Sequence, residues 1–278
     1  MLMNFSTSNR AQATLIGFIL LFGILVISLS LYQAQIIPNQ NAEVEFNHYQ
    51  EVQDDMVNLY AEISTIGSSP KSGQIVVPVT TGTRYPQRIG INPPPVAGTI
   101  ESTDSGTMFI NGSSNGITDI CGSNTTSGIR YESGYHVLQQ SSITYENGIL
   151  YLKDNQEDYV ILEQQTLVDN SSRNINLYRL NGTFRNRGSV RSIPIELTGT
   201  KTYGEVELSV NNESGITLPS NLPASQWNSN ILPSGITATQ NGSSVDLSGF
   251  GERSYTIKCH TVGLGQRPVT EFKYKKSY

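Results

Sequence analysis

The longest apolar run in the chain is ATLIGFILLFGILVISLSL, residues Ala13–Leu31, and it carries no charged side chain. In an α-helix these nineteen residues would span nearly 30 Å at about 1.5 Å per residue, which matches the hydrocarbon core of a bilayer. A cleaved secretory signal normally has a shorter apolar core of about 7–15 residues, followed by a small-residue cleavage site. Leu31–Gln35 (LYQAQ) offers no such site. The sequence therefore predicts a retained transmembrane helix over residues 12–34.

The charges on either side of this run predict its orientation. Arg10 precedes the run, whereas the first charges after it are Glu43 and Glu45, and no lysine or arginine follows before Lys71. Cytoplasmic segments next to membrane helices carry an excess of Lys and Arg. We therefore expect residues 1–11 to form a cytoplasmic leader and the chain beyond residue 34 to lie outside, which makes a single-pass cell-membrane protein or a component of a surface filament.

The junction Arg10-Ala11-Gln12 stands directly before the apolar run and resembles the class III signal sequence of archaeal type IV pilins and archaellins. In that family a prepilin-type peptidase cuts before the hydrophobic segment and leaves it on the mature protein. The resemblance implies cleavage between Ala11 and Gln12, with this peptidase, the membrane and other pilin-like subunits as partners. Bacterial pilins place a glutamate five residues into the mature chain, where this chain has Ile16, so the match is to the archaeal pattern only.

Five further motifs resemble those of a group of haloarchaeal surface proteins with pilin-like amino termini, a resemblance that spans most of the chain and implies no activity. They are Thr83–Pro86, Asn92–Pro95, Tyr145–Gly148, Thr166–Asp169 and Leu180–Gly182. The net charge of −5 is a departure, because halophile proteins are usually far more acidic.

An amphipathic helix is predicted over residues 35–68. Pro38 lacks an N–H donor and is expected to kink or break the helix that precedes it, with Asn39 or Asn41 capping a second helix. Apolar residues then recur at helical spacing, and Gly67 supplies the end. The apolar positions are Val44, Val52, Met56, Leu59, Ile63 and Ile66.

The opposite face of this segment is acidic, while the last 26 residues of the chain are basic. The acidic face is either a solvated surface or a charge complement for a neighbouring subunit that offers the basic tail. In pilins a membrane helix continued by an amphipathic helix carries a β-rich head, and the layout here is similar. The acidic residues are Glu43, Glu45, Glu51, Asp54, Asp55 and Glu62, and the basic ones are Arg253, Lys258, Arg267, Lys273, Lys275 and Lys276.

Residues 71–278 are expected to form an extracytoplasmic β-rich domain, which makes the fold class α+β: a long N-terminal helix, then an antiparallel, sandwich-like head. Asn147-Gly148 predicts a type I′ hairpin, and Trp227 a buried anchor on a short helix over Pro223–Ile231. Ile100–Arg130 is expected to be a loop. The strand candidates are Ile75–Val79, Met108–Ile110, Ile143–Tyr145, Ile149–Leu152, Tyr159–Leu162, Asn174–Leu180, Val190–Leu197, Glu205–Val210 and Ser254–Cys259.

Composition narrows the function. Hydrophobic residues make up 37% and charged residues 15% of the 278 residues, which is lean for a soluble globular protein. The acidic balance argues against nucleic-acid binding, which normally uses a basic patch. With three histidines and two cysteines, dense zinc ligation and a multi-disulfide scaffold are excluded. No motif for a nucleophile, a phosphate or dinucleotide site, or a metal is found, so neither catalysis nor a cofactor is expected.

Two kinds of modification are predicted outside the membrane. Cys121 and Cys259 either form a disulfide or are two unrelated buried thiols. N-glycosylation sequons occur six times in the predicted head. The sequon asparagines are Asn111, Asn124, Asn170, Asn181, Asn212 and Asn241.

The first functional hypothesis is a pilin-like cell-surface subunit, cleaved after Ala11 and assembled through Leu15–Leu31 into a type IV pilus-like filament. Its large head favours a minor subunit. The alternative is a membrane-tethered surface glycoprotein or adhesin that does not polymerise and whose ligand the sequence does not identify. Gly17 and Gly23 permit close helix packing in either case.

Overall fold

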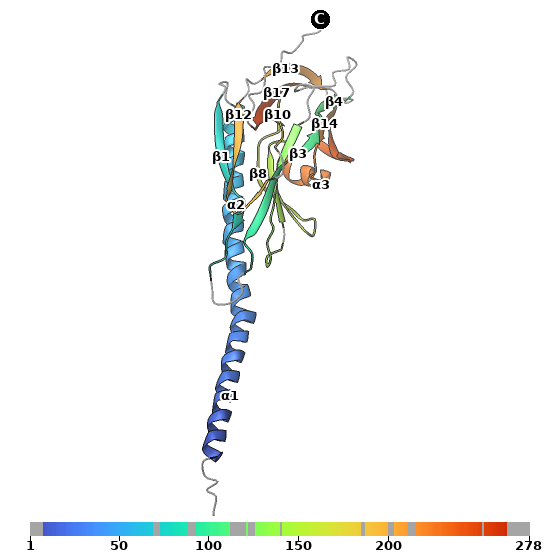
Figure 1. Cartoon of the computed structure of the whole chain (residues 1–278). Helices are drawn as coiled ribbons and strands as arrows, with labels where there is room; N and C mark the ends of the chain where they lie inside the picture. The colour runs from blue at the N-terminus through green and yellow to red at the C-terminus, as the bar shows by residue number, and fades with distance from the viewer. Residues whose placement is uncertain are drawn as a thin grey trace, which may run out of the picture.

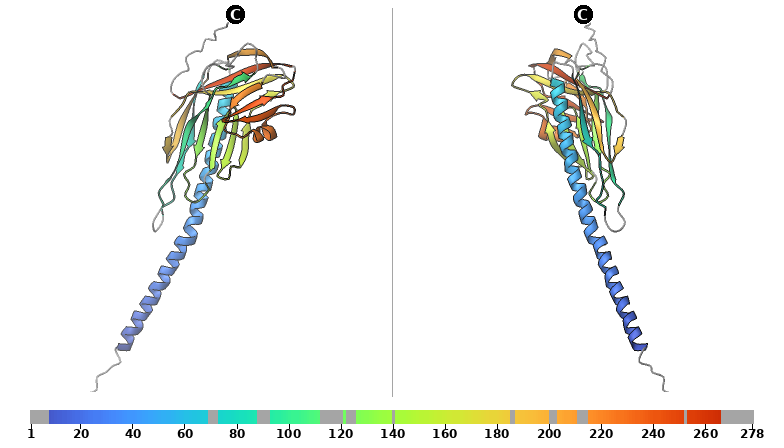
Figure 2. Two further views of the ribbon diagram at one scale, coloured as in Figure 1. Left: turned by 90° about the vertical axis from the view of Figure 1, so that its right-hand side faces the viewer. Right: turned by 60° about the vertical axis from the view of Figure 1, so that its left-hand side comes forward.

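The computed structural model describes residues 8–68, 73–87, 93–111, 121, 126–139, 141–184, 187–199, 203–210, 215–251 and 253–265. The chain has the predicted α+β architecture, with one long amino-terminal helix followed by a head dominated by antiparallel β-sheet. In Figure 1 the helix leaves the head as a single rod, and the two further views in Figure 2 show the head gathered around one end of that rod.

The rod consists of α1 (Ser8–Leu31), the π-helical turn η1 (Tyr32–Ile36) and α2 (Ile37–Ser68), with no break between them. The predicted break at Pro38 and a new cap at Asn39 or Asn41 are therefore wrong. Instead, the N–H of Ile37 donates to the carbonyl of Tyr32, five residues back. A local π turn is one way in which a helix accommodates a proline that cannot donate and that crowds the preceding turn.

The apolar stripe predicted for α2 is confirmed. Its members Val52, Met56, Leu59, Ile63 and Ile66 are buried, and Val44 is half-buried.

Buried polar residues continue this stripe towards α1, at positions Asn41, Glu45 and His48. The expectation that Glu45 belongs to the exposed acidic face is wrong, because its side chain is fully buried. The contact between the head and α2 therefore extends further towards the amino terminus than the apolar residues alone indicate.

The head contains seventeen strands within the described residues, and all nine predicted strands coincide with one of them. The strands are β1 (Gln74–Thr80), β2 (Gly82–Thr83), β3 (Val96–Gly106), β4 (Phe109–Asn111), β5 (Thr126–Glu132), β6 (Ser141–Glu146), β7 (Ile149–Asp154), β8 (Tyr159–Gln164), β9 (Val168–Asp169), β10 (Asn174–Asn181), β11 (Arg187–Ser189), β12 (Ser192–Gly199), β13 (Tyr203–Val210), β14 (Gly215–Pro219), β15 (Thr237–Asn241), β16 (Ser244–Ser248) and β17 (Arg253–Leu264).

The expectation of a loop over Ile100–Arg130 is wrong where β3, β4 and β5 fall within this range, and residues 112–120 and 122–125 lie outside the described residues. Most of β3 and β5 fall within this range, and the two strands pair from Thr99↔Glu132 to Gly106↔Thr126. Their Ser, Thr, Gly and Asp content hides the period-2 signal. Tertiary packing compensates for the weak local preference, since Ile100 and Ile129 are fully buried in the core.

The head has three layers. The main path of the large sheet runs β1-β12-β17-β10-β5-β6-β7-β8, with β10 and β17 parallel, and a second sheet has the order β15-β16-β14-β4. Side chains along β7 alternate between the two cores: Leu150 packs with α2, while Ile149 and Tyr151 pack with the smaller sheet. The large sheet is therefore covered by α2 on one face and by the smaller sheet on the other.

Two local predictions are confirmed. Asn147 and Gly148 have φ values of 51° and 80° and join Glu146 to Ile149 in a two-residue hairpin, as a type I′ turn requires. The predicted short helix is α3 (Ala224–Gln226) continued by η2 (Trp227–Ile231), and Trp227 is fully buried between the two sheets.

Candidate membrane anchor and its junction with the head

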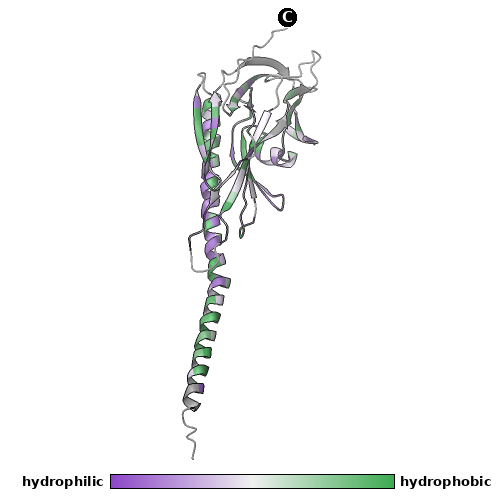
Figure 3. Ribbon diagram, in the orientation of Figure 1, coloured by the Kyte–Doolittle hydropathy of each residue, from purple (hydrophilic) through white to green (hydrophobic). Residues whose placement is uncertain are grey.

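Within the part of the chain that the structure describes, one helix is long and apolar enough to cross a membrane. Its apolar side chains point outward on all sides, and Leu15, Phe18 and Leu21 are each 60% exposed or more. Figure 3 shows the contrast along the rod, with hydrophobic residues on α1 and a mixture of polar and apolar residues on α2. A helix that is apolar all round is suited to a lipid or protein environment and not to water.

The three residues of the predicted processing motif lie in the first turns of α1. Arg10, Ala11 and Gln12 are all helical, and the side chain of Gln12 is exposed. The structure places the motif at the end of the rod that is furthest from the head (Figure 1), with Gln12 directly before the apolar run.

Glu45 is the centre of the junction between α2 and the head. Its carboxylate accepts a hydrogen bond from the hydroxyl of Tyr85, which follows β2. It also accepts backbone N–H groups from the segment between β5 and β6: His136 at 2.9 Å, Val137 at 3.0 and 3.2 Å, and Leu138 at 2.7 Å. Three successive N–H groups that converge on one carboxylate form an anion-binding nest. Because Glu45 is fully buried, these donors replace the water that it loses on folding.

A second contact lies one turn further along the same face of α2. His48 Nδ1 lies 2.8 Å from the hydroxyl of Tyr135, and the two rings meet edge to face. Tyr49 adds a second edge-to-face contact with Tyr135. The turn of α2 from Glu45 to Tyr49 therefore fixes the connection between β5 and β6 by polar and aromatic contacts together.

We call the contacts of Glu45 and His48 with Tyr85 and residues 135–138 the junction latch. The spacing of Asn41, Glu45, His48, Val52 and Met56 is 4, 3, 4 and 4, which continues the buried stripe. This periodicity was the available sequence signal for the latch, because a carboxylate in phase with a buried stripe has to be satisfied by the head.

Acid is expected to loosen the junction latch in two stages. Burial lowers the pKa of His48 below 6.5, against the carboxylates of Glu51 and Asp55, which raise it. The unfolded chain therefore binds a proton that the folded chain does not, and stability falls as the pH drops below 6.5. Burial also raises the pKa of Glu45, but its hydrogen bonds from Tyr85 and the backbone outweigh burial and hold the pKa below 4.5. Its contribution is lost as the pH falls below that value.

Hydrogen exchange of the amides of residues 136–138 measures this loosening. We expect protection to decrease between pH 6.5 and 4.5 in the native chain, beyond the chemical pH dependence of exchange. The variant His48→Gln should lose this first stage and keep the second, below pH 4.5. Protection that is independent of pH after correction for intrinsic exchange would contradict the assignment.

A second buried carboxylate, Glu146, holds the β6–β7 hairpin against the smaller sheet. It accepts hydrogen bonds from Ser220 Oγ at 2.6 Å and from the N–H groups of Asn221 and Leu222. Trp227 Nε1 donates to the same Ser220 hydroxyl at 3.1 Å. Burial raises the pKa of Glu146 despite these hydrogen bonds. Both of its oxygens have protein partners, which is the pattern of a structural carboxylate.

The structure joins Cys121 and Cys259 in a disulfide, with a Cα–Cα distance of 5.7 Å. Of the two alternatives left by the sequence, the bridge is therefore the one present. Both cysteines are buried in the core between the two sheets. Arg179 donates from Nη1 to the carbonyl of Cys121 at 2.5 Å, so residue 121 is held by β10 as well as by β17.

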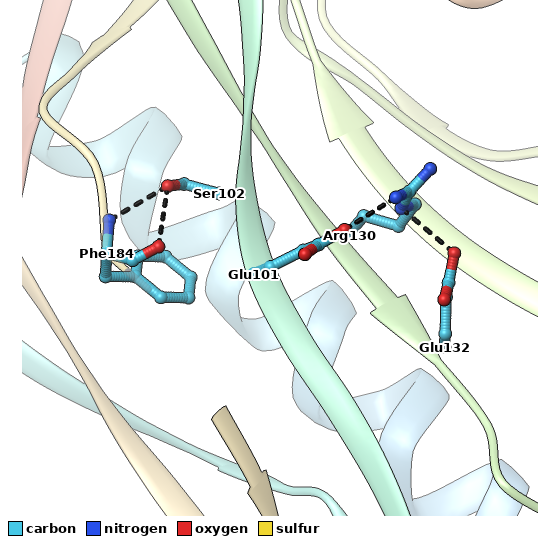
Figure 4. A network of polar contacts seen from close by, with 5 residues as sticks. All are labelled: Glu101, Ser102, Arg130, Glu132 and Phe184. Atoms are coloured by element: carbon cyan, nitrogen blue, oxygen red, sulfur yellow. Dashed lines mark hydrogen bonds and ion pairs between the residues drawn. The ribbon is translucent and has the colours of Figure 1, made fainter. Parts of the chain in front are cut away.

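A polar network links β3, β5 and the segment that follows β10. Figure 4 shows Arg130 between Glu101, at 2.5 Å, and Glu132, at 3.2 Å. In the same view the hydroxyl of Ser102 accepts the N–H of Phe184 at 2.8 Å and donates to its carbonyl at 2.9 Å. The ion pairs are partly exposed and contribute about 0–1 kcal/mol each. These three charges are therefore engaged with one another.

The sequons differ in accessibility. Asn170 lies in an exposed turn and Asn241 is exposed at the end of β15, whereas Asn181 is half-buried in β10, paired with Gly263 of β17. Asn111 lies in β4, and Asn124 and Asn212 lie outside the described residues.

We expect glycans on Asn170 and Asn241 and none on Asn181, since a glycan needs an exposed amide. Intact-glycopeptide mass spectrometry of the protein extracted from cell envelopes measures the occupancy of each. A glycan replaces one hydrogen of Nδ2, so Asn170 Oδ1 can still accept from the Tyr255 hydroxyl and Asn241 Nδ2 keeps one N–H for Asp246. Occupied Asn181 with bare Asn170 and Asn241 would contradict this prediction.

No group of three or more His, Cys, Asp or Glu side chains that could hold a metal ion occurs among the described residues. In comparisons with known proteins, no protein-family model, curated protein or solved structure matches the chain.

Proposed function

We propose that the chain is a membrane-anchored, pilin-like cell-surface protein that enters a type IV pilus-like filament through α1. In this proposal a prepilin-type peptidase removes residues 1–11, α1 lies first in the membrane and then among the helices of neighbouring subunits, and the head faces the exterior. Neither anchoring in the membrane nor packing into a filament requires a catalytic group.

The observation that carries the proposal is the continuity of the rod. The apolar surface of α1 is bare, while α2 buries its stripe in the head, and the π turn joins the two without a linker. A tether needs only a flexible connection between anchor and head. A subunit that packs through its anchor helix benefits from a head held at a fixed position on that helix, and the junction latch provides this.

The mature amino terminus tests the proposal. Mass spectrometry of the protein from cell envelopes should find a chain that begins at Gln12. The variant Ala11→Trp, which places a bulky side chain before the expected cut, should retain residues 1–11. Asn9→Ala, outside the motif, should be processed normally.

The other outcomes are equally informative. An intact chain that begins at Met1 would refute the pilin-like proposal and favour the non-polymerising surface tether. A chain that begins beyond residue 33 would show that the apolar run is a cleaved secretory signal. If Gln12 is the first residue, electron microscopy of sheared surface filaments then tests polymerisation itself.

A further inference from the structure

The strands at the two ends of the main path of the large sheet, β1 and β8, differ in how well they are protected against pairing with a further strand. At one end, β1 pairs with β12 and carries Pro78 at its centre, opposite Pro194. The N–H of Thr80, two residues along, points away from β12 and donates to Asp55 of α2 at 2.7 Å. Pro78 faces the same way, so it removes a donor from the outer edge of β1. Proline and a covering helix are devices that prevent a further strand from pairing with an edge.

At the other end of the sheet, α2 contacts β8 far less extensively than it contacts β1. Among the described residues, β8 pairs with β7 alone, and its sequence YVILEQ contains no proline. Val160 is 55% exposed. A groove of about 550 Å³ follows this edge, lined by every residue of β8 and by Asn230 of η2. The groove is open to solvent rather than enclosed.

The hydrogen bonds within the β7–β8 hairpin show which groups of β8 face this groove. The N–H of Asp154 donates to the carbonyl of Asp158, so this opposing pair is hydrogen-bonded. Peptide groups alternate in direction along an antiparallel strand, so those of Val160 face β7 and those of Tyr159 and Ile161 face outward. Beyond a register shift, Gln165 donates to Gly148, which leaves Gln164 facing outward.

The surroundings of this edge are acidic. Glu163 is exposed on β8, and the turn that precedes β8 carries Asp154, Glu157 and Asp158. Lys153 is the cation of the hairpin, and its ammonium group is 3.5 Å from Glu157. An added strand would therefore be favoured if it carried positive charge.

The carboxyl-terminal segment of the sequence has this chemistry. Residues 266–278, QRPVTEFKYKKSY, contain four cations and one acid. Within them, Phe272 and Tyr274 alternate with Lys273 and Lys275, the period-2 pattern of a strand with one aromatic and one basic face. Basic charge at this end of the sequence was noted above as a complement for an acidic surface on a neighbouring subunit.

We propose that Phe272–Lys276 of a neighbouring copy adds to the outer edge of β8 as a further β-strand. This inference rests on the proposed function, in which copies lie side by side. Strand addition obtains affinity from main-chain hydrogen bonds and specificity from alternate side chains. The lysines of the added strand complement Glu163 and the acidic turn.

The neighbouring copy is favoured over the same chain by reach. Gly265 follows β17, and a strand added outside β8 lies six strand spacings of about 4.8 Å from β17, roughly 29 Å measured across the sheet. The seven residues from Gln266 to Phe272 cover roughly 23–25 Å when fully extended. The chain's own tail is therefore too short to bring Phe272 to this position.

A labelled synthetic peptide of residues 266–278, titrated into the detergent-solubilised full chain, tests the proposal by fluorescence anisotropy. We expect the peptide to bind saturably, with a Kd below about 1 mM. Ile161→Pro removes an outward donor and keeps the bonds to β7, and it should weaken binding by about tenfold or more. The matched control Val76→Pro, on the protected edge of β1, should leave binding unchanged. Equal affinities for these two variants would overturn the proposal.

Two further measurements serve as controls. Modified peptides test strand addition without altering the protein, and a truncated chain tests whether the bound tail comes from a neighbouring copy. Two peptides, one N-methylated at Lys273 and one at Tyr274, each lack a single main-chain donor. Because successive N–H groups of a strand point to opposite edges, at least one of the two peptides should bind the unchanged protein about tenfold or more weakly. A chain truncated after Gly265 should bind the peptide with the same affinity as the full chain. Binding by the truncated chain alone would overturn the assignment to a neighbour. Absence of peptide binding would refute strand addition while leaving the amino-terminal processing result intact.

Discussion

Glu45→Ala is expected to lower the free energy of unfolding by about 3–5 kcal/mol. The substitution removes the acceptor for the Tyr85 hydroxyl and for the N–H groups of residues 136–138, in a place that water does not reach. Each buried donor left without a partner costs about 1–3 kcal/mol, reduced where the segment can move out into water. Denaturant unfolding in detergent, followed by the fluorescence of Trp227, measures the change.

Two matched variants separate the latch from the general effect of altering an acidic helix. Glu45→Gln keeps one oxygen acceptor and should cost less than the alanine variant. Glu43→Gln changes an exposed residue two positions away and should alter the free energy by about 0.5 kcal/mol or less. The latch would be refuted as an energetic element if Glu45→Ala were as mild as Glu43→Gln.

Loss of the Cys121–Cys259 disulfide is expected to cost about 4–5 kcal/mol in the chain-entropy model. The two cysteines are separated by 138 positions, so the bridge restricts a very large loop in the unfolded chain. The variant Cys121→Ala/Cys259→Ala tests this by its denaturation midpoint relative to the oxidised native protein.

The single variants supply the control. Since either one breaks the bridge, Cys121→Ala and Cys259→Ala should each cost nearly as much as the double variant, and the effects should not add. Reduction of the native chain should shift its midpoint in the same direction. Identical midpoints for the reduced and oxidised chains would contradict the prediction.

The elements that the sequence predicts well are those whose own residues carry a period. The α2 stripe from Val52 to Ile66 has helical spacing, and Asn147-Gly148 has the dihedral preferences of its turn. In contrast, β3 and β5 consist largely of small polar residues whose strand conformation depends on their partners. The continuous helix at Pro38 depends on a one-residue change of hydrogen-bond spacing, for which the sequence has no separate signal.

The junction shows why the candidate site was only partly predictable. The helical phase places Glu45 on the buried side, but its partners are backbone N–H groups of residues 136–138, about ninety positions away. Backbone donors have no side-chain signature. The same limit applies to the open edge of β8, because YVILEQ is recognisable as a strand while its place at the end of the sheet follows only from the order of all the others.

Because α1, η1 and α2 form one continuous helix, the direction in which the head projects from the helix axis is fixed relative to α1. Each residue of an α-helix turns the chain by about 100°, so a rod without a linker sets which side of the head faces which side of the anchor. Removing a single residue from Tyr32–Ile36 would swing the whole head by about 100° around the rod while every contact within it survived. The π turn contains one additional residue. It therefore determines the rotational position of the head about the helix axis, as well as accommodating Pro38.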